Sequence, residues 1–596
     1  MPTVDDSAPG GAPQAVDAIT REVLRGRFDA VTLEMQAALV QASYSPIVTE
    51  GKDATSAIFD LAGRTISQPS AEPVHLGVLI DPARLIAQRY PQGVAQPGDL
   101  YIANDPYGGG SSHSPDIAIF APAFHGTRLV GYAATMTHHM DIGGLAPGSM
   151  NVEAVDIHAE GIRIPLLRLA HGGAFNEEAF ELIVAASRTP LNIRGDLNAQ
   201  IASCRSGAAR FAEIFADYEH DVVYAAIDEL MDYADRMTRA ELAAIPPGEA
   251  ECVDWLDGDA ITPGGPPVEY RVKVRIDGPE IHFDFTGSAP QLRSALNNVR
   301  SSTVAVCYFA VRLLTGDSVP NNDGCYRAVT VTTPLGSVVN ARYPAPVAVR
   351  GIGLKRIEDV VLGALARLLP QRMCAGHSGQ YSMLMLSGDD GEGRRVQGLA
   401  IGPYAGGHGA RPGKDGIDVT EHGVTNGAAF PIEFAESKLP ILFRRVELWR
   451  DSGGAGTWRG GLGFEAETEW RGGEATASIR RERHKFVPRG IEGGFDSVRC
   501  ETQLVRASGE TLQLPGVARL SVGHGDVFHA KTTGGGGYGP PWERDPALVL
   551  DDVLDGRVSA ERAREVYGVA LVGDSVDHAA TSGLRQRIRA AREAKV

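Results

Sequence analysis

The sequence has no hydrophobic run long enough to cross a bilayer, which takes about 18 to 20 consecutive apolar residues. The longest run, near Thr303 to Leu314, is interrupted by Cys307 and Arg312. The start of the chain also lacks a basic segment followed by an apolar one. Residues 1–15 are acidic and rich in proline and glycine, which predicts a disordered arm and no signal peptide. We therefore expect a cytoplasmic protein with no membrane partner.

Basic residues and closely spaced cysteines are scarce as well. The 57 Lys and Arg residues against 74 Asp and Glu residues give a formal charge of −17. This balance argues against nucleic acid as the main partner, because a phosphate backbone selects for a positive face. The six cysteines form no C-x-x-C pair and are expected to be reduced, small apolar side chains. With 596 residues, the chain is long enough for several packed units.

Polar residues are concentrated between Asn104 and Pro165, where histidines and aspartates alternate with glycines and prolines. Two alternating apolar runs in this stretch, residues 117–124 and 129–137, are separated by His-Gly-Thr-Arg. They predict an antiparallel hairpin with a four-residue loop. If Phe124 and Leu129, which flank the loop, face each other, then counting back along the two strands places His138 opposite Pro115.

The open end of this hairpin would bring together His113, Asp116 and the pair His138–His139. Two imidazoles and a carboxylate are the ligand set expected for Zn, Mn or Fe in a site that keeps open positions. If side chains alternate strictly between the two faces of the sheet, His138 lies on the same face as His113, and His139 lies on the same face as Asp116. Because Pro115 interrupts the first strand, either histidine remains a candidate ligand. The alternative is a buried polar hairpin end with ordinary hydrogen-bonded histidines.

Two more polar residues stand at the ends of predicted elements. Asp53 lies just before a strand at residues 55–59, from where its carboxylate could point into a site. A turn or capping role for this aspartate is an equal interpretation. His75 begins a helix, and we expect it to make a structural hydrogen bond to a loop.

The periodicity predicts a mixed α/β (α+β), multidomain protein with a metal-bearing N-terminal half and a Gly-rich, β-containing C-terminal half. The glycines near residue 535 would let the backbone approach another surface closely, or form a plain flexible turn. After the arm at 1–15 we expect these regions: a metal-binding α/β region with a helical segment at 16–245, a β-rich region at 246–345, a Gly-rich α/β region at 346–480, and a β-containing region with a helical tail at 481–596.

Several motifs resemble the B-type subunit of the hydantoinase B/oxoprolinase family. They are NDPY-x-GG-x-x-H-x-x-D from Asn104, HH-x-D-I-G-G followed by PGSM, and EG-I-R-I-P. The resemblance continues through GARPGKDGID, DSGGAGTWRGGLG and TTGGGGYGPPWER, so it covers nearly the whole chain. The family includes N-methylhydantoinase, 5-oxoprolinase, lactamase, and acetone or acetophenone carboxylase complexes.

The resemblance implies a divalent metal held by His113, Asp116 and His138, with Asp53 as a weaker candidate for a fourth ligand. His139 and Asp141 would be catalytic residues that orient the ligands or carry protons. The implied reaction is the opening of a cyclic amide (a hydantoin, oxoproline or a lactam) after phosphoryl activation. An A-type partner subunit, of the actin-like ATPase class, would bind the ATP and Mg.

The sequence contains no credible ATP site of its own. Gly413–Lys414 resembles a phosphate loop, but His408 and Asp415 stand where that pattern needs Gly and Ser or Thr. The turn that starts at Asp141 is similar to the phosphate turn of sugar-kinase-like ATPases, but Leu145 replaces the usual Thr. The absence of a phosphate-binding motif from this sequence is consistent with nucleotide binding by a partner.

Two alternative functions share the same motifs. An ATP-dependent ketone carboxylase of the acetone or acetophenone type would need the same metal site, with a ketone as substrate. A non-catalytic scaffold that only holds the ATPase partner would not need the site at all. The intact histidine and aspartate motifs argue against the scaffold.

Overall fold

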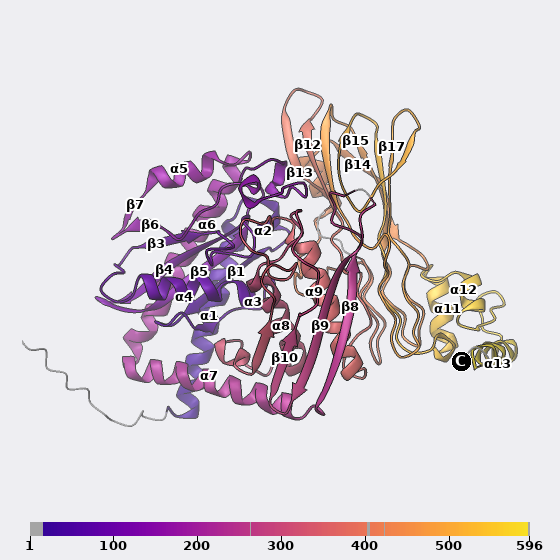
Figure 1. Cartoon of the computed structure of the whole chain (residues 1–596), viewed down its shortest axis with the longest axis horizontal. Helices are drawn as coiled ribbons and strands as arrows, with labels where there is room; N and C mark the ends of the chain where they lie inside the picture. Colours follow the sequence, from indigo (N-terminus) through magenta and orange to yellow (C-terminus); the bar gives the residue numbers. More distant parts are fainter. Residues whose placement is uncertain (1–15, 263, 402–405, 422, 594–596) are drawn as a thin grey trace, which may run out of the picture.

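The computed structural model describes residues 16–262, 264–401, 406–421 and 423–593 (Figure 1). Helices and four sheets are combined in this part of the chain, so the expected mixed α/β, multidomain class is confirmed. The arm expected at residues 1–15 lies outside the described residues.

A seven-stranded sheet forms the centre of the N-terminal half. Its strands are all antiparallel, in the order β2-β1-β5-β4-β3-β6-β7. The strands are β1 (Ala54–Phe59), β2 (Thr65–Ser67), β3 (Leu100–Ala103), β4 (Asp116–His125), β5 (Arg128–His138), β6 (Leu167–His171) and β7 (Ala174–Phe175). Burial on both faces explains why β4 is apolar almost throughout.

Long helices cover one face of this sheet. Ile58, Ile117 and Ile119 point to this side and share a core with Phe28 and Phe211 on the helices. Residues 177–243 are helical apart from breaks at residues 186–189 and 218–219. The helices are α1 (Ala18–Ala42), α5 (Glu177–Ala185), α6 (Pro190–Asp217) and α7 (His220–Ala243), and the short α2 (Pro46–Thr49) follows α1.

The other face of the sheet packs on a second layer of helices and a four-stranded sheet ordered β11-β10-β9-β8. One core holds buried residues from Ala57 to Val517, so all four regions expected after the arm contribute to it. Their division into separate regions stays a prediction. The elements are α3 (His75–Val78), α4 (Ile80–Arg89), α8 (Arg300–Thr315), α9 (Arg350–Leu368), β8 (Gly248–Leu256), β9 (Val268–Asp277), β10 (Glu280–Asp284) and β11 (Val329–Thr332).

Two further sheets, ordered β13-β12-β16-β19 and β14-β15-β20-β17-β18, share one core in the C-terminal half. Three helices beyond them form a small separate lobe, on the right in Figure 1. The strands are β12 (Met383–Asp389), β13 (Arg395–Ile401), β14 (Ile441–Leu448), β15 (Phe464–Trp470), β16 (Ala475–Arg480), β17 (Glu501–Val505), β18 (Thr511–Gln513), β19 (Val517–Val522) and β20 (Val527–Lys531). The helices are α10 (Ile432–Lys438), α11 (Pro546–Leu554), α12 (Ala560–Glu565) and α13 (His578–Glu593).

The glycine-rich segments of the C-terminal half lie side by side and are joined by backbone hydrogen bonds. Gly461 N–H donates to His408 O, and Gly535 N–H donates to Gly461 O, both at 2.9 Å. A Cβ added at Gly461 would lie 1.9 Å from Ile417 O, and one at Gly535 would lie 2.0 Å from His408 O. The glycines therefore do allow a close backbone approach, and the surface that they approach belongs to the same chain.

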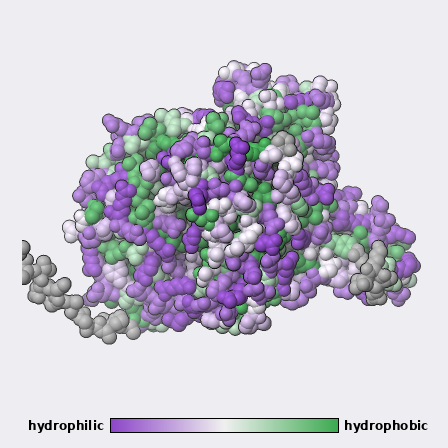
Figure 2. All heavy atoms as spheres, viewed as in Figure 1, coloured by the Kyte–Doolittle hydropathy of each residue, from purple (hydrophilic) through white to green (hydrophobic). Residues whose placement is uncertain are grey.

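None of the helices in the described part of the chain combines the length and the apolar character needed to span a membrane. Hydrophilic residues cover much of the face drawn in Figure 2, interspersed with hydrophobic ones.

We predict that Gly535→Ala destabilises the fold and that Gly26→Ala does not. An alanine Cβ at position 535 would force the packed backbones apart, and such overpacking costs about 1–3 kcal/mol. Gly26 is exposed within α1 with no atom within 4 Å of an added Cβ, so alanine there should stabilise by roughly 0.5–1 kcal/mol. Denaturant unfolding followed by circular dichroism measures both variants. Equal unfolding midpoints would contradict the close backbone packing.

Candidate metal centre

The hairpin of β4 and β5 contains an irregularity that the sequence pattern did not predict. Phe124 pairs with Leu129 as expected, but the next pair along the ladder joins Ala123 to Gly131. Val130 is therefore an extra residue in β5, as in a β-bulge. The strands also continue closer to the turn than predicted, which leaves a loop of two residues, 126–127, in place of four.

The bulge changes which residues meet at the open end of the hairpin. His138 pairs with Asp116, one position away from the predicted partner Pro115. Directly paired residues of adjacent strands point to the same face, so the two side chains lie next to each other. Strict alternation had placed His139 on the face of Asp116, and that prediction is wrong because of the extra residue.

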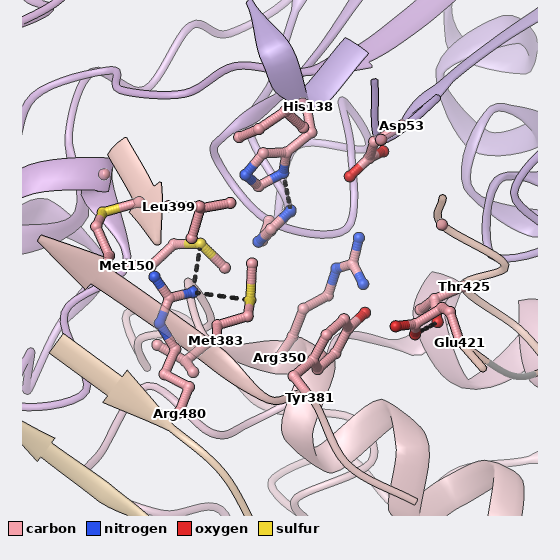
Figure 3. A pocket seen from close by; sticks show the side chains of 18 of the residues that line it. Asp53, His138, Met150, Arg350, Tyr381, Met383, Leu399, Glu421, Thr425 and Arg480 are labelled. Carbon is pink, nitrogen blue, oxygen red and sulfur yellow. Dashed lines mark hydrogen bonds between the residues drawn. The ribbon is translucent and has the colours of Figure 1, made fainter. Parts of the chain in front are cut away.

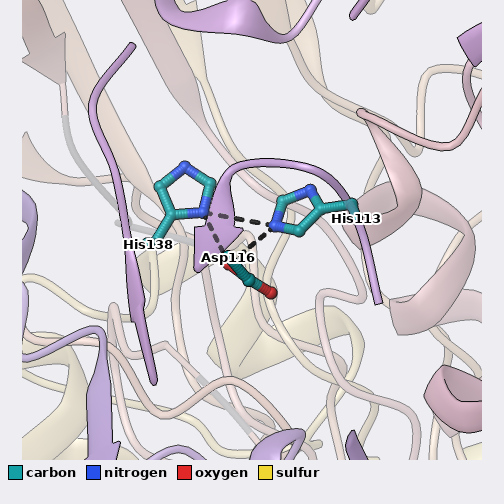
Figure 4. A group of neighbouring side chains, drawn as sticks. All are labelled: His113, Asp116 and His138. Carbon is teal, nitrogen blue, oxygen red and sulfur yellow. Dashed lines mark hydrogen bonds and ion pairs between the residues drawn. The ribbon is translucent and has the colours of Figure 1, made fainter. Parts of the chain in front are cut away.

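The side chains of His113, Asp116 and His138 converge at this end of the sheet (Figure 4). His113 Nε2 is 2.9 Å and His138 Nδ1 is 3.0 Å from Asp116 Oδ1, and the two nitrogens are 3.2 Å apart. All three side chains are buried. Three potential ligand atoms thus form a small triangle inside the protein.

This triangle has the dimensions of a metal coordination face. Ligand atoms about 2.1 Å from a common ion, and at right angles to one another, lie about 3 Å apart. The observed separations of 2.9 to 3.2 Å match that arrangement. Two imidazoles and one carboxylate suit Zn, Mn or Fe, so the residues fit a divalent transition metal.

The outer nitrogen of His113 is held by the backbone of a distant segment. Its Nδ1 lies 2.9 Å from Ala348 O, which favours an Nδ1–H donor and leaves the Nε2 lone pair facing the triangle. The N–H groups of Val347 and Ala348 both donate to Glu160 Oε1 at 2.7 Å, which fixes that backbone. Burial lowers the pKa of His113 to about 4, so the imidazole is neutral near pH 7 and can act as a ligand.

Arg350, at the start of α9, holds the carboxylate of Asp116. Its Nη2 donates to Asp116 Oδ2 at 2.8 Å, and Ser112 Oγ lies 3.2 Å from the same oxygen. Oδ1 is thereby turned to the two histidines. Burial opposes ionisation of this carboxyl, but the positive charge of Arg350 and the hydrogen bonds with His113 and His138 outweigh it and hold the pKa well below its usual range.

Asp53 lies next to His138, directly before β1, which is the neighbour of β5 in the sheet. Ala54 pairs with Thr137, and His138 N–H donates to Asp53 O at 3.2 Å. Asp53, His138 and Asp116 therefore form a row across β1, β5 and β4. The buried Oδ1 of Asp53 has no hydrogen-bond partner in the described part of the chain. A free carboxylate oxygen at the end of this row fits a further ligand.

Asp53 also belongs to a second group of potential ligands, with Glu72 and His75. His75 Nε2 is 3.9 Å from Asp53 Oδ1. The structural hydrogen bond expected for His75 is not found, because both ring nitrogens are buried without a partner among the described residues. Burial lowers the pKa of His75. Burial, together with the charges of Asp53 and other carboxylates, raises the pKa of Glu72 well above its usual value.

The structure places His139 and Asp141 outside the triangle. His139 Nε2 lies 3.0 Å from Gln200 Oε1 on α6, on the opposite face of the sheet from His138. Asp141 accepts the backbone N–H groups of Gly143 and Gly148 at 2.9 Å, and Arg188 Nη1 lies 3.1 Å from its Oδ2. Neither side chain forms a hydrogen bond to the triangle within the described residues, and both contacts stabilise the surrounding frame.

The triangle opens into a pocket that lies between the two halves of the chain (Figure 3). The N-terminal half contributes Asp53, His113 and His138. Sequence reasoning missed the polar residues from the C-terminal half, since no motif links positions so far apart. They are Arg350, Tyr381, Glu421, Thr425 and Arg480.

The family model of hydantoinase B/oxoprolinase matches residues 17–541 of the chain. The caprolactamase subunit beta from Pseudomonas jessenii is 32% identical over 582 residues, which cover 96% of this chain and 99% of that protein. These matches extend over nearly the whole sequence.

Solved structures agree with these sequence matches. The crystal structure of the ATP-dependent caprolactamase from Pseudomonas jessenii is similar with a TM-score of 0.88 and 30% identity, covering 96% of this chain and 100% of that chain. A nucleotide-free structure of acetone carboxylase also gives a TM-score of 0.88, at 20% identity, and covers 97% of this chain and 84% of its own. At that identity the likeness shows the fold alone.

We predict that the purified protein holds about one divalent transition metal per chain and that His113→Ala removes it, because one of three converging ligands is lost. His125→Ala is the matched control, since His125 lies at the other end of β4, where it contacts His220. Elemental analysis measures the metal content of all three proteins. Equal content in the wild type and His113→Ala would contradict the assignment.

Proposed function

The chain belongs to the hydantoinase B/oxoprolinase family, and from this premise we propose that it is the metal-binding B-type subunit of an ATP-dependent enzyme that opens a cyclic amide. The substrate would be a hydantoin, oxoproline or a lactam. The observation that carries the proposal is the convergence of His113, Asp116 and His138 in a buried pocket. The likeness to a caprolactamase subunit supports an amide over other substrates.

An A-type partner subunit would bind ATP with Mg and activate the amide by phosphorylation. The phosphate-binding patterns in this chain each fail at a defining position, so activation needs a second protein. A similar protein is described as an ATP-dependent caprolactamase, and its matching chain is named subunit beta.

His113, Asp116 and His138 would hold the metal, and Asp53 is our candidate for a fourth ligand. A divalent ion there would polarise the reacting group or lower the pKa of bound water to near neutral. The chain's own residues prepare this site. His113 is neutral because it is buried, and Ala348 O accepts its Nδ1–H, so the Nε2 lone pair faces the triangle. Arg350 keeps the Asp116 carboxylate ionised and turned inward.

His139 and Asp141 would act indirectly in this proposal. His139 follows His138 and anchors the strand end to Gln200 on α6. Asp141 ties the loop at residues 143–148 to Arg188. Both contacts would keep His138 in position, and neither residue needs to touch the substrate.

The alternatives are distinguishable from the proposed hydrolase. In the comparison of solved structures, acetone carboxylase is 20% identical to this chain, whereas the caprolactamase is 30% identical. A non-catalytic scaffold would not need three buried ligands that face one another. Bound metal in the purified protein would therefore argue against the non-catalytic scaffold.

We predict that this chain alone neither hydrolyses ATP nor opens a cyclic amide, and that co-expression with an A-type subunit from the same genome gives both activities. The physical reason is the separation of phosphate binding from the metal site. ATP hydrolysis is measured with a panel of hydantoins, oxoproline and lactams, and with ketones plus bicarbonate. Asp116→Asn in the same complex is the control for the metal site. Substrate-stimulated ATP hydrolysis by the isolated chain would contradict the prediction.

We also predict a stable complex with equal numbers of the two subunits, most simply two of each. A phosphorylated amide would hydrolyse in water, so the ATP site and the metal must share an enclosed space. Such obligate contacts bury on the order of 2,000 Å² or more and often repeat by two-fold symmetry. Size-exclusion chromatography with light scattering measures the assembly. Subunits that elute separately at micromolar concentration, yet are fully active when mixed, would refute it.

A further inference from the structure

The wall of the pocket away from His138 carries a buried cation, Arg480, at the end of β16 (Figure 3). Only 2% of its surface is exposed. The neighbouring wall is apolar, with Met150, Met383 and Leu399 around the guanidinium. A charged group has thus been placed in a setting that favours neutral ones.

Arg480 lacks the anionic partner that such a cation normally requires. Its Nη1 contacts only the sulfurs of Met150, at 2.6 Å, and Met383, at 4.0 Å, and sulfur is a weak acceptor. Its buried Nε and Nη2 have no hydrogen-bond partner within the described part of the chain. The carboxylate of Glu421, in the same pocket, is already paired with Lys355.

Several other buried arginines of this protein are paired with carboxylates, whereas Arg481, which does not line the pocket, has no such pair among the described residues. Arg350 pairs with Asp116, and Arg356 pairs with Asp254 and Asp359. These pairs show how the fold satisfies a buried guanidinium when the cation only supports the structure. An unpaired guanidinium that lines a pocket instead points to a partner that arrives with the ligand.

The two unpaired nitrogens define the shape of that partner. Nε and Nη2 lie on one edge of the guanidinium, and this edge binds two oxygens of a carboxylate or phosphoryl group side by side. We propose that Arg480 is the binding site for an oxyanion of the substrate, namely a carboxylate carried by the cyclic amide or the phosphoryl group placed on it. This proposal rests on the proposed function, since it shares the pocket with the candidate metal ligands.

The arrangement also defines how such a substrate would lie. When the oxyanion is a carboxylate of the substrate, the amide end would face His138 and Asp53, and the carboxylate would face Arg480 on the other wall. The aliphatic part between them would contact the methionine side chains, which adapt readily to different shapes. The substrate class is therefore an anionic cyclic amide, or a neutral one that becomes anionic on phosphorylation.

Calorimetric titration of the full-length, metal-loaded chain tests this with three probes: 5-oxoproline, its uncharged analogue 2-pyrrolidone, and inorganic phosphate. We expect Arg480→Met to weaken the binding of an anionic probe by about 10-fold or more and to leave 2-pyrrolidone unchanged. Arg480→Lys should retain part of the affinity, because lysine keeps the positive charge. It should not retain all of it, because lysine lacks the two parallel N–H donors of the guanidinium edge.

The matched control is Arg481→Met. Arg481 is equally buried, with 2% of its surface exposed, but it does not line the pocket. A loss confined to 5-oxoproline assigns the site to the substrate carboxylate, and a loss confined to phosphate assigns it to the phosphoryl group. Equal affinities for every probe in the wild type and Arg480→Met would overturn the proposal.

Thermal unfolding separates ligand binding from a structural role. Removal of an unpaired buried charge should leave the unfolding temperature of Arg480→Met unchanged or higher. A lower unfolding temperature with unchanged probe binding would show that Arg480 is structural and overturn the proposal. Metal content is measured in parallel: a chain without metal refutes the proposed function, whereas normal metal with unchanged probe binding refutes only the role of Arg480.

Discussion

The candidate site depends on one buried ion pair, between Asp116 at the end of the hairpin and Arg350 at the start of α9. The two residues come from different halves of the chain, and both are buried. Loss of either partner would leave an uncompensated charge in the interior, which is far more costly than replacing the pair. The pair also brings the segment with Ala348 to His113, whose outer nitrogen it fixes. The triangle of ligands can therefore form only when both halves are folded together.

Local patterns in the sequence were enough to find most of the N-terminal half. Alternating apolar residues predicted the hairpin, and the region expected at 16–245 was predicted to include a helical segment, where α1, α6 and α7 lie. The bulge was missed, although one residue marks it. Gly131 stands alone within an apolar strand, and a Cβ there would lie 2.3 Å from Phe59 O. An isolated glycine in a strand often marks a bulge or a close backbone approach.

The rest of the site could not be predicted because it is made by contacts between distant segments. Arg350, Glu421 and Arg480 lie in stretches with no recognisable motif, and a single sequence does not show which cation meets which carboxylate. His139 shows the opposite limit. It lies inside the most informative motif, yet a strand turns adjacent side chains to opposite faces, so it contacts Gln200 on α6 and not the triangle. A residue in a motif can therefore serve the frame of a site and not its chemistry.

The charges around the pocket are unevenly distributed, and this distribution would orient a bound ligand. Asp53, Glu72 and Asp116 lie at the end where the candidate ligands converge, and their mutual repulsion contributes to the raised pKa of Glu72. A bound divalent cation would relieve this repulsion, since such an ion is the largest local charge in its site. Arg480 stands on the other wall without a counter-ion among the described residues. A ligand that is electron-rich at the metal end and anionic at the far end would satisfy both walls at once, and one bound in reverse would satisfy neither.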